Sequence, residues 1–92
     1  MSRTATATLT IVNELGLHAR AATMLVRLAA GYASDLYLAK DGREVNGKSI
    51  MSVLLLTATK GSRIDVRAVG DDSEELVAAV ARLAADKFGE KT

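Results

Sequence analysis

The sequence contains no cysteine, no proline and no tryptophan, and its only aromatic residues are one phenylalanine and two tyrosines. Without cysteine the chain can form neither disulfides nor thiolate metal sites. The single histidine, His18, also excludes a centre built from several histidine ligands, so we expect no metal and no cofactor. Twelve Lys and Arg residues nearly balance eleven Asp and Glu residues, and aromatic stacking platforms are missing, which together argue against binding to nucleic acid.

No hydrophobic run approaches the length of a membrane span, and the first eight residues lack the continuous apolar stretch of a signal peptide. We therefore expect a cytoplasmic protein that does not insert into membranes and whose partners are other proteins. A length of 92 residues suits one domain with a single core. We expect that domain to span residues 1–92 and to be a monomer.

Four segments have the pattern of β-strands. Threonines alternate with apolar residues over 4–12, and charged residues alternate with apolar ones over 63–69. Each of these strands is therefore expected to have one buried and one solvated face. Residues 35–40 and 43–46 are expected to form a hairpin, because the Asp-Gly pair between them tolerates the positive φ of a tight turn.

Two further segments favour helices. Apolar residues recur at helical spacing over 19–30, and Gly31 stands where glycine commonly follows a helix. The apolar run 47–56 is also compatible with a buried strand. Ser49 is a suitable N-cap within it, and this favours a short helix.

A last helix is expected after Gly70. Asp72 and Glu75 have the spacing of a capping box, and an apolar stripe follows at Leu76, Val80, Leu83 and Ala84. The resulting order is βαββαβα. Strands with one polar face and amphipathic helices predict an α+β open-faced sandwich, in which three helices cover one face of a four-stranded antiparallel sheet.

His18 lies where the first strand pattern gives way to the first helix. The first N–H groups of a helix lack intrahelical acceptors and carry partial positive charge, which favours a bound phosphoryl group by about 0.3–1 kcal/mol. Arg20 adds a fixed cation whose donors fit phosphate oxygens. A lone histidine in a small domain is more often a partly buried side chain or a helix cap, but this position favours phosphoryl chemistry on His18 itself.

Two separated motifs resemble the HPr family, the histidine-containing phosphocarrier proteins of the bacterial phosphoenolpyruvate-dependent phosphotransferase system. Residues 13–20, Asn-Glu-Leu-Gly-Leu-His-Ala-Arg, resemble its active-site motif, and residues 46–51, Asn-Gly-Lys-Ser-Ile-Met, resemble its regulatory-serine motif. The distance between the motifs and the βαββαβα order also match. The resemblance therefore covers essentially the whole chain and implies an HPr-like fold.

The resemblance implies that His18 accepts a phosphoryl group through Nδ1 from enzyme I and passes it to enzyme II A-domains. Arg20 would neutralise the phosphoryl oxygens during both transfers. The family motif commonly continues with proline, where this chain has Ala21. Alanine is a good helix former, so we expect the helix to persist and the exchange to alter transfer rates or partner preference.

Ser49 matches the family's regulatory serine, which an ATP-dependent HPr kinase/phosphorylase phosphorylates in some bacteria. A phosphate at this position would lie on a helix N-terminus. A helix cap worth about 0.5–2 kcal/mol would explain the serine equally well, so both interpretations stay open.

The resemblance implies a docking surface around His18, an apolar patch of Met24, Ile50, Met51 and Leu54 with Arg27 at its edge to meet acidic partners. Flexible thioethers suit a surface that must fit several partners in turn. We expect the two methionines and Ile50 to be at least partly exposed. The neighbouring residues expected in the core are Leu25, Val26, Leu28 and Val53.

Two other functions stay open. One is a non-carrier regulatory module of the same fold that acts through phosphorylated Ser49, although the presence of His18 argues against it. The other is a carrier of the nitrogen-related branch of the phosphotransferase system. No second acid–base group is expected near His18, which argues against a self-sufficient enzyme.

Overall fold

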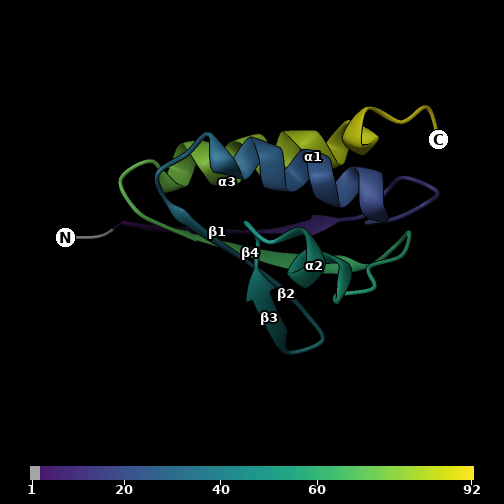
Figure 1. The fold of residues 1–92 in the computed structure, drawn as a ribbon, viewed down its shortest axis with the longest axis horizontal. Helices are drawn as coiled ribbons and strands as arrows, with labels where there is room; N and C mark the ends of the chain where they lie inside the picture. The colour runs from purple at the N-terminus through teal and green to yellow at the C-terminus, as the bar shows by residue number, and fades with distance from the viewer. Residues whose placement is uncertain (1–2) are drawn as a thin grey trace.

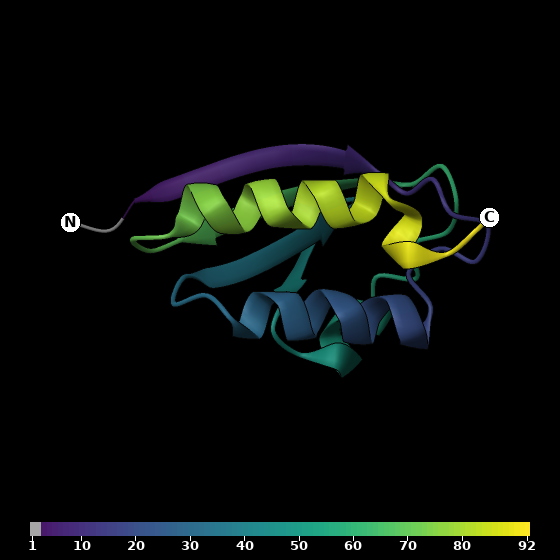
Figure 2. The same cartoon turned by 90° about the horizontal axis from the view of Figure 1, so that it is seen from above.

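The computed structural model describes residues 3–92 and has the predicted βαββαβα order. The elements are β1 (Thr4–Thr10), α1 (Ala19–Ala30), β2 (Asp35–Lys40), β3 (Arg43–Asn46), α2 (Ile50–Leu54), β4 (Arg63–Val69), α3 (Ser73–Ala85) and a short 3-10 turn, η1 (Lys87–Gly89). The four strands form one antiparallel sheet in the order β1-β4-β2-β3. Figures 1 and 2 show α1 and α3 side by side over the sheet, with α2 next to α1. The open-faced sandwich is confirmed.

The predicted alternation along the strands produces the core. The two central strands, β2 and β4, bury Leu36, Leu38, Ile64, Val66 and Ala68 under the helices. Arg63 and Asp65 alternate with the buried residues of β4 and are exposed. Within residues 3–92, no helix is both long enough and apolar enough to cross a membrane.

The turn between β2 and β3 is the predicted Asp-Gly hairpin, with φ 51° at Asp41 and 81° at Gly42. The first strand is shorter than expected, because β1 ends at Thr10 and not at position 12. The next residue, Ile11, is fully buried, but its N–H donates to the carbonyl of Ser62, at 2.9 Å, in the loop before β4. The N–H of Gly61 in the same loop donates to the Ile11 carbonyl at 2.7 Å, so the pairing extends to Ile11 and the loop that leads to His18 begins after it.

Helix α1 packs against the core mainly through small side chains. The fully buried residues of α1 are Ala21, Ala22, Leu25 and Ala29. Val26 and Leu28, which were expected in the core, are only half-buried. At 100° per residue both lie on the flanks of the buried stripe, so the prediction that they are core residues was wrong. Leu83 of α3 is likewise half-buried.

Ser49 caps α2 as predicted. Its Oγ accepts a hydrogen bond from the N–H of Ser52 at 3.3 Å, and the helix begins at Ile50. The apolar run is therefore a helix and not a buried strand. Val53 is its one fully buried residue, Ile50 and Met51 are exposed, and Ser52 and Leu54 are half-buried.

The capping box predicted for α3 is not formed. Asp72 precedes the helix, but its carboxylate makes no cap hydrogen bond. It accepts instead from the N–H groups of Ala33 and Ser34, at 2.9 and 2.8 Å, and from the Ser34 hydroxyl. These donors, the hydroxyl first, lower the pKa of Asp72. The carboxylate therefore ties the start of α3 to the loop before β2.

Replacing Asp72 tests this tie. We expect Asp72→Asn to lower the midpoint of thermal unfolding at pH 7, because an amide oxygen is a weaker acceptor than a carboxylate. A lowered pKa stabilises the fold above the ordinary value of 3.8, and the contribution is lost as the pH falls through the folded value. The difference from wild type should therefore shrink below pH 4. Glu75→Gln is the control. If Glu75→Gln lost as much stability as Asp72→Asn, the capping-box prediction would be correct after all.

Candidate functional site

A tight loop places His18 at the start of α1. Gly16 adopts φ 67°, and a side chain there would collide with the carbonyl oxygen of Ala58. The next N–H, of Leu17, donates to that same carbonyl at 2.8 Å. His18 then occupies the N-cap position of α1 without making a side-chain cap bond. The imidazole is therefore free to make other contacts.

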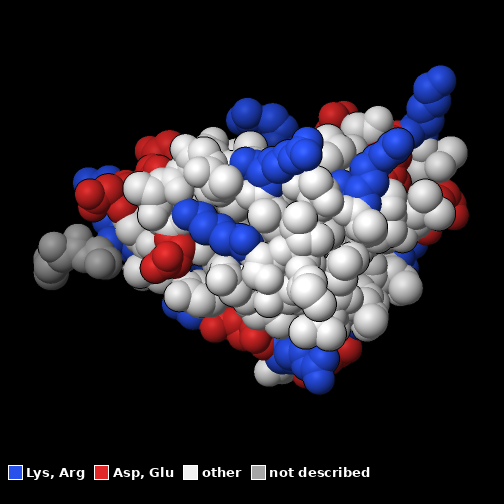
Figure 3. Space-filling model, in the orientation of Figure 1, with Lys and Arg blue, Asp and Glu red and all other residues white. Residues whose placement is uncertain are grey.

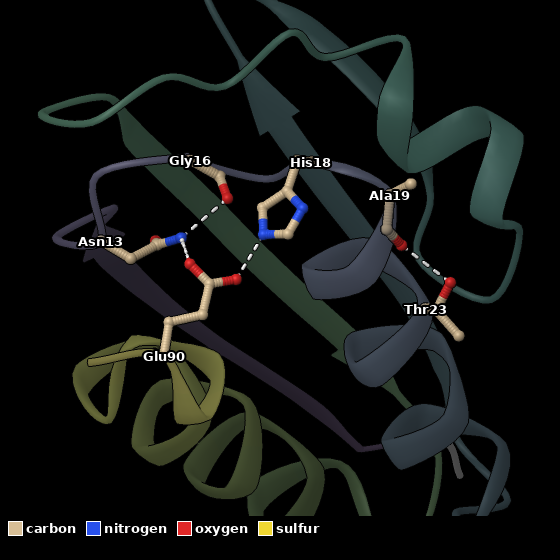
Figure 4. Close-up of polar contacts among 6 residues, drawn as sticks. All are labelled: Asn13, Gly16, His18, Ala19, Thr23 and Glu90. Atoms are coloured by element: carbon tan, nitrogen blue, oxygen red, sulfur yellow. Dashed lines mark hydrogen bonds and ion pairs between the residues drawn. The ribbon is translucent and has the colours of Figure 1, made fainter. Parts of the chain in front are cut away.

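The imidazole of His18 contacts the carboxylate of Glu90. Nε2 faces Oε2 of Glu90, and Figure 4 shows the other ring nitrogen, Nδ1, turned away from the carboxylate toward the start of α1. The side chains of His18 and Glu90 are 28% and 12% exposed. One expectation was therefore wrong, because a second titratable group does lie beside the half-buried His18. The sequence reasoning missed Glu90.

Asn13 orients the carboxylate of Glu90. This fully buried side chain donates through Nδ2 to the carbonyl of Gly16 at 2.8 Å and to Oε1 of Glu90 at 2.9 Å. The hydrogen bond with His18, followed by that from Asn13 and the nearby charge of Arg20, lowers the pKa of Glu90 despite its partial burial. Glu90 is therefore ionised at neutral pH, and each of its oxygens has a defined partner.

The segment after α3 brings Glu90 to this position. Lys87 and Phe88 have φ of 58° and 54°, which turns the chain back after the helix. The Phe88 side chain is buried in the core, and the carbonyl of Thr92 accepts from the N–H of Glu14 at 2.7 Å. The sequence signals for this return are a single large apolar residue after the last helix and the glycine that follows it, Gly89, with φ 78°.

The start of α1 offers unpaired donors beside His18. Ala22 is the first residue of the helix whose N–H is bonded, to the carbonyl of His18 at 2.8 Å. The N–H groups of residues 19–21 have no acceptor within residues 3–92. Arg20 is exposed, while Ala21 is buried in the first turn, so the helix persists without the family's proline as expected. Within residues 3–92, no group of three or more acidic or histidine side chains lies close enough together to hold a metal ion.

An exposed apolar patch lies on α1 and α2. Met24, Ile50 and Met51 are exposed as expected, Met51 by 78%, and Arg27 is also exposed. Leu54 is half-buried against the core, and its neighbour Leu55, which the sequence reasoning missed, is 61% exposed. Figure 3 shows a broad surface without charged side chains over this region, bordered by Lys and Arg.

The family model described as the PTS HPr component phosphorylation site matches residues 5–86. "Phosphocarrier protein HPr" of Cupriavidus necator is 43% identical over 81 residues, which cover 88% of this chain and 91% of that protein. The protein of the same name from Xylella fastidiosa is 45% identical, covering 91% of this chain and 94% of the relative. The crystal structure of HPr-C-His from Thermoanaerobacter tengcongensis superposes with a TM-score of 0.92 at 39% identity, covering 96% and 99% of the two chains.

The chain therefore belongs to the HPr family, the phosphocarrier proteins of the phosphotransferase system. The histidine loop, the three α-helices and all of the sheet except Thr4 fall within the matched residues. Glu90, which contacts His18, lies beyond them.

Removing the Asn13 amide should loosen this site. We expect Asn13→Ala to lower the free energy of unfolding by about 1–3 kcal/mol, because one buried and one partly buried hydrogen bond are lost and the Gly16 carbonyl is left unpaired. Denaturant unfolding gives this number, and amide exchange should be faster at Glu14, whose N–H bonds the C-terminal segment. Asn46→Ala removes an exposed amide and serves as the control. Equal effects of the two variants would show that Asn13 does not hold the segment.

Proposed function

We propose that this protein is a cytoplasmic phosphocarrier that accepts a phosphoryl group on Nδ1 of His18 from enzyme I and passes it to enzyme II A-domains. The observation that supports this most directly is the placement of the two ring nitrogens. Nε2 is engaged by Glu90, and Nδ1 faces the unpaired N–H groups at the start of α1. A nucleophile thus lies beside donors for the oxygens of the incoming group.

The transfer needs few protein groups. Nδ1 attacks the phosphorus with its lone pair, while the bond from phosphorus to the donor protein breaks and its electron pair returns to the donor. Negative charge on the phosphoryl oxygens then meets the helix N–H groups and the exposed guanidinium of Arg20. A few donors without a metal stabilise the phosphoryl group without trapping it, so it can leave again for the next protein.

Docking of the partners would use the apolar patch and its basic border. Met24, Ile50 and Met51 provide adaptable apolar contact, as does Leu55, which takes the place expected for Leu54. Arg20 and Arg27 would face acidic groups on enzyme I and on the A-domains. The same surface can serve both partners because they bind in turn.

Ser49 is proposed as a regulatory position. Its hydroxyl caps α2 between the exposed patch and the end of the hairpin, so a kinase would reach a side chain that is only half-buried. A phosphate here would add about two negative charges beside Ile50 and Met51. Docking to an acidic partner would then weaken.

Incubation with enzyme I and phosphoenolpyruvate tests the carrier proposal. Wild type should gain one phosphate that is lost in acid and retained in base, whereas His18→Ala should gain none, as intact-mass measurement will show. Ser49→Ala is the control and should be labelled like wild type. His18→Ala also loses the Glu90 contact, so about 1–2 kcal/mol of stability should be lost without unfolding. Labelling of His18→Ala at the wild-type rate would remove His18 from the proposal.

Ser49→Asp tests the docking patch. A carboxylate can still cap α2, so stability should stay within about 1 kcal/mol of wild type. The Michaelis constant of enzyme I for this protein should rise by about tenfold with little change at saturation, because the added charge must approach an acidic partner. Thr6→Asp adds the same charge on the open face of the sheet as a control. An unchanged Michaelis constant for Ser49→Asp would place the docking surface elsewhere.

A further inference from the structure

Contacts on both sides of Glu90 in the chain, and at its carboxylate, hold it beside His18. The buried ring of Phe88 anchors the chain two residues before it, and the bond from Glu14 to the Thr92 carbonyl anchors it two residues after. Asn13 then fixes one oxygen of the carboxylate, which leaves the other for His18. Three independent contacts therefore determine where this carboxylate lies.

An ionised carboxylate can only accept hydrogen bonds. The proton between Glu90 and His18 must therefore be carried by Nε2, and a neutral imidazole with its proton on Nε2 has its lone pair on Nδ1. We propose that Glu90, oriented by Asn13, is a positioning residue that selects the His18 tautomer in which Nδ1 is the nucleophile. This inference rests on the proposed function and names the residue that makes the reaction specific for one ring nitrogen.

The same contact serves after the transfer. When Nδ1 has bonded to phosphorus, the ring carries a positive charge and keeps its proton on Nε2. The Glu90 carboxylate, in contact with that N–H, stabilises this charge and needs no proton transfer to do so. In the second transfer a nucleophile of the acceptor protein bonds to phosphorus, the phosphorus–nitrogen bond breaks, its electron pair returns to Nδ1, and the ring is again neutral with the proton still on Nε2. Glu90 thus supports both directions of transfer.

The arrangement of Asn13 makes a glutamine variant more informative than an alanine variant. The Asn13 Nδ2 group is fixed by the Gly16 carbonyl and presents a hydrogen to Oε1 of Glu90. In Glu90→Gln the amide oxygen must take that position, so the amide N–H₂ group faces His18. Nε2 of His18 would then become the acceptor and the proton would move to Nδ1. The variant that best preserves shape should therefore block the nucleophile.

The test compares wild type, Glu90→Gln, Glu90→Ala and Glu14→Gln in two measurements. The ring ¹⁵N chemical shifts of His18, at a pH where the spectra show a neutral ring, report which nitrogen carries the proton. The rate of phosphoryl acceptance from enzyme I and phosphoenolpyruvate reports the nucleophile. Glu14→Gln is a matched control, because it removes the same charge from a carboxylate that pairs with Lys60, at 2.6 Å, and not with His18.

We expect the proton on Nε2 in wild type and in Glu14→Gln, and a shift toward Nδ1 in Glu90→Gln. Acceptance by Glu90→Gln should be at least about tenfold slower than wild type, with Glu90→Ala between them, because fixing a histidine in the wrong tautomer slows its chemistry by orders of magnitude. A Glu90→Gln protein that keeps the Nε2 proton, or that accepts phosphate faster than Glu90→Ala, would overturn the inference. Absence of labelling in wild type would instead overturn the carrier proposal, while the ring shifts would still decide the tautomer.

Discussion

Nε2 of His18 and the carboxylate of Glu90 come from positions 72 residues apart, and their contact determines what the imidazole can do. It commits one ring nitrogen to the protein and leaves the other facing the start of α1. The buried Phe88 and Asn13 side chains hold the carboxylate in place from two sides. The loop before α1 and the segment after α3 therefore form one site, although each alone would be an ordinary surface turn.

The surroundings of His18 reflect a carrier that must bind its cargo and then release it. In the proposed function, the unpaired N–H groups at the start of α1 and the exposed Arg20 would attract phosphoryl oxygens without enclosing them. Next to them, Met51 and Leu55 expose most of their apolar surface, which gives up the free energy that burial would provide. Such exposure is typical of a surface that is covered only while a partner is bound.

Local sequence signals predicted the fold well because they act over a few residues. The strand alternation, the Asp-Gly hairpin and the Ser49 cap all depend on near neighbours and are present in the structure. The Asp72 carboxylate had a local donor available in the N–H of Glu75, but it accepts instead from Ala33 and Ser34, which lie 39 and 38 residues away. A distant partner of this kind leaves no periodic signal in the sequence.

Part of the candidate site could be predicted from local signals and part could not. His18, Arg20 and the start of α1 follow from a motif and from helix geometry. Glu90 could not be assigned because Phe88 and Gly89 alone do not indicate that the chain turns back through three consecutive residues with positive φ, Lys87, Phe88 and Gly89. Val26 and Leu28 were misassigned for a similar reason. The helical pattern locates the buried side of α1, but what packs against the helix decides how wide that side is.

The position of the phosphate on the imidazole is the measurement that tests this account most directly. In the phosphorylated protein, ³¹P and ¹⁵N NMR spectra identify the nitrogen bonded to phosphorus and the nitrogen that keeps its proton. The account predicts a bond from phosphorus to Nδ1 of His18 and a proton retained on Nε2, facing Glu90. A phosphate on Nε2, or on a residue other than His18, would contradict it.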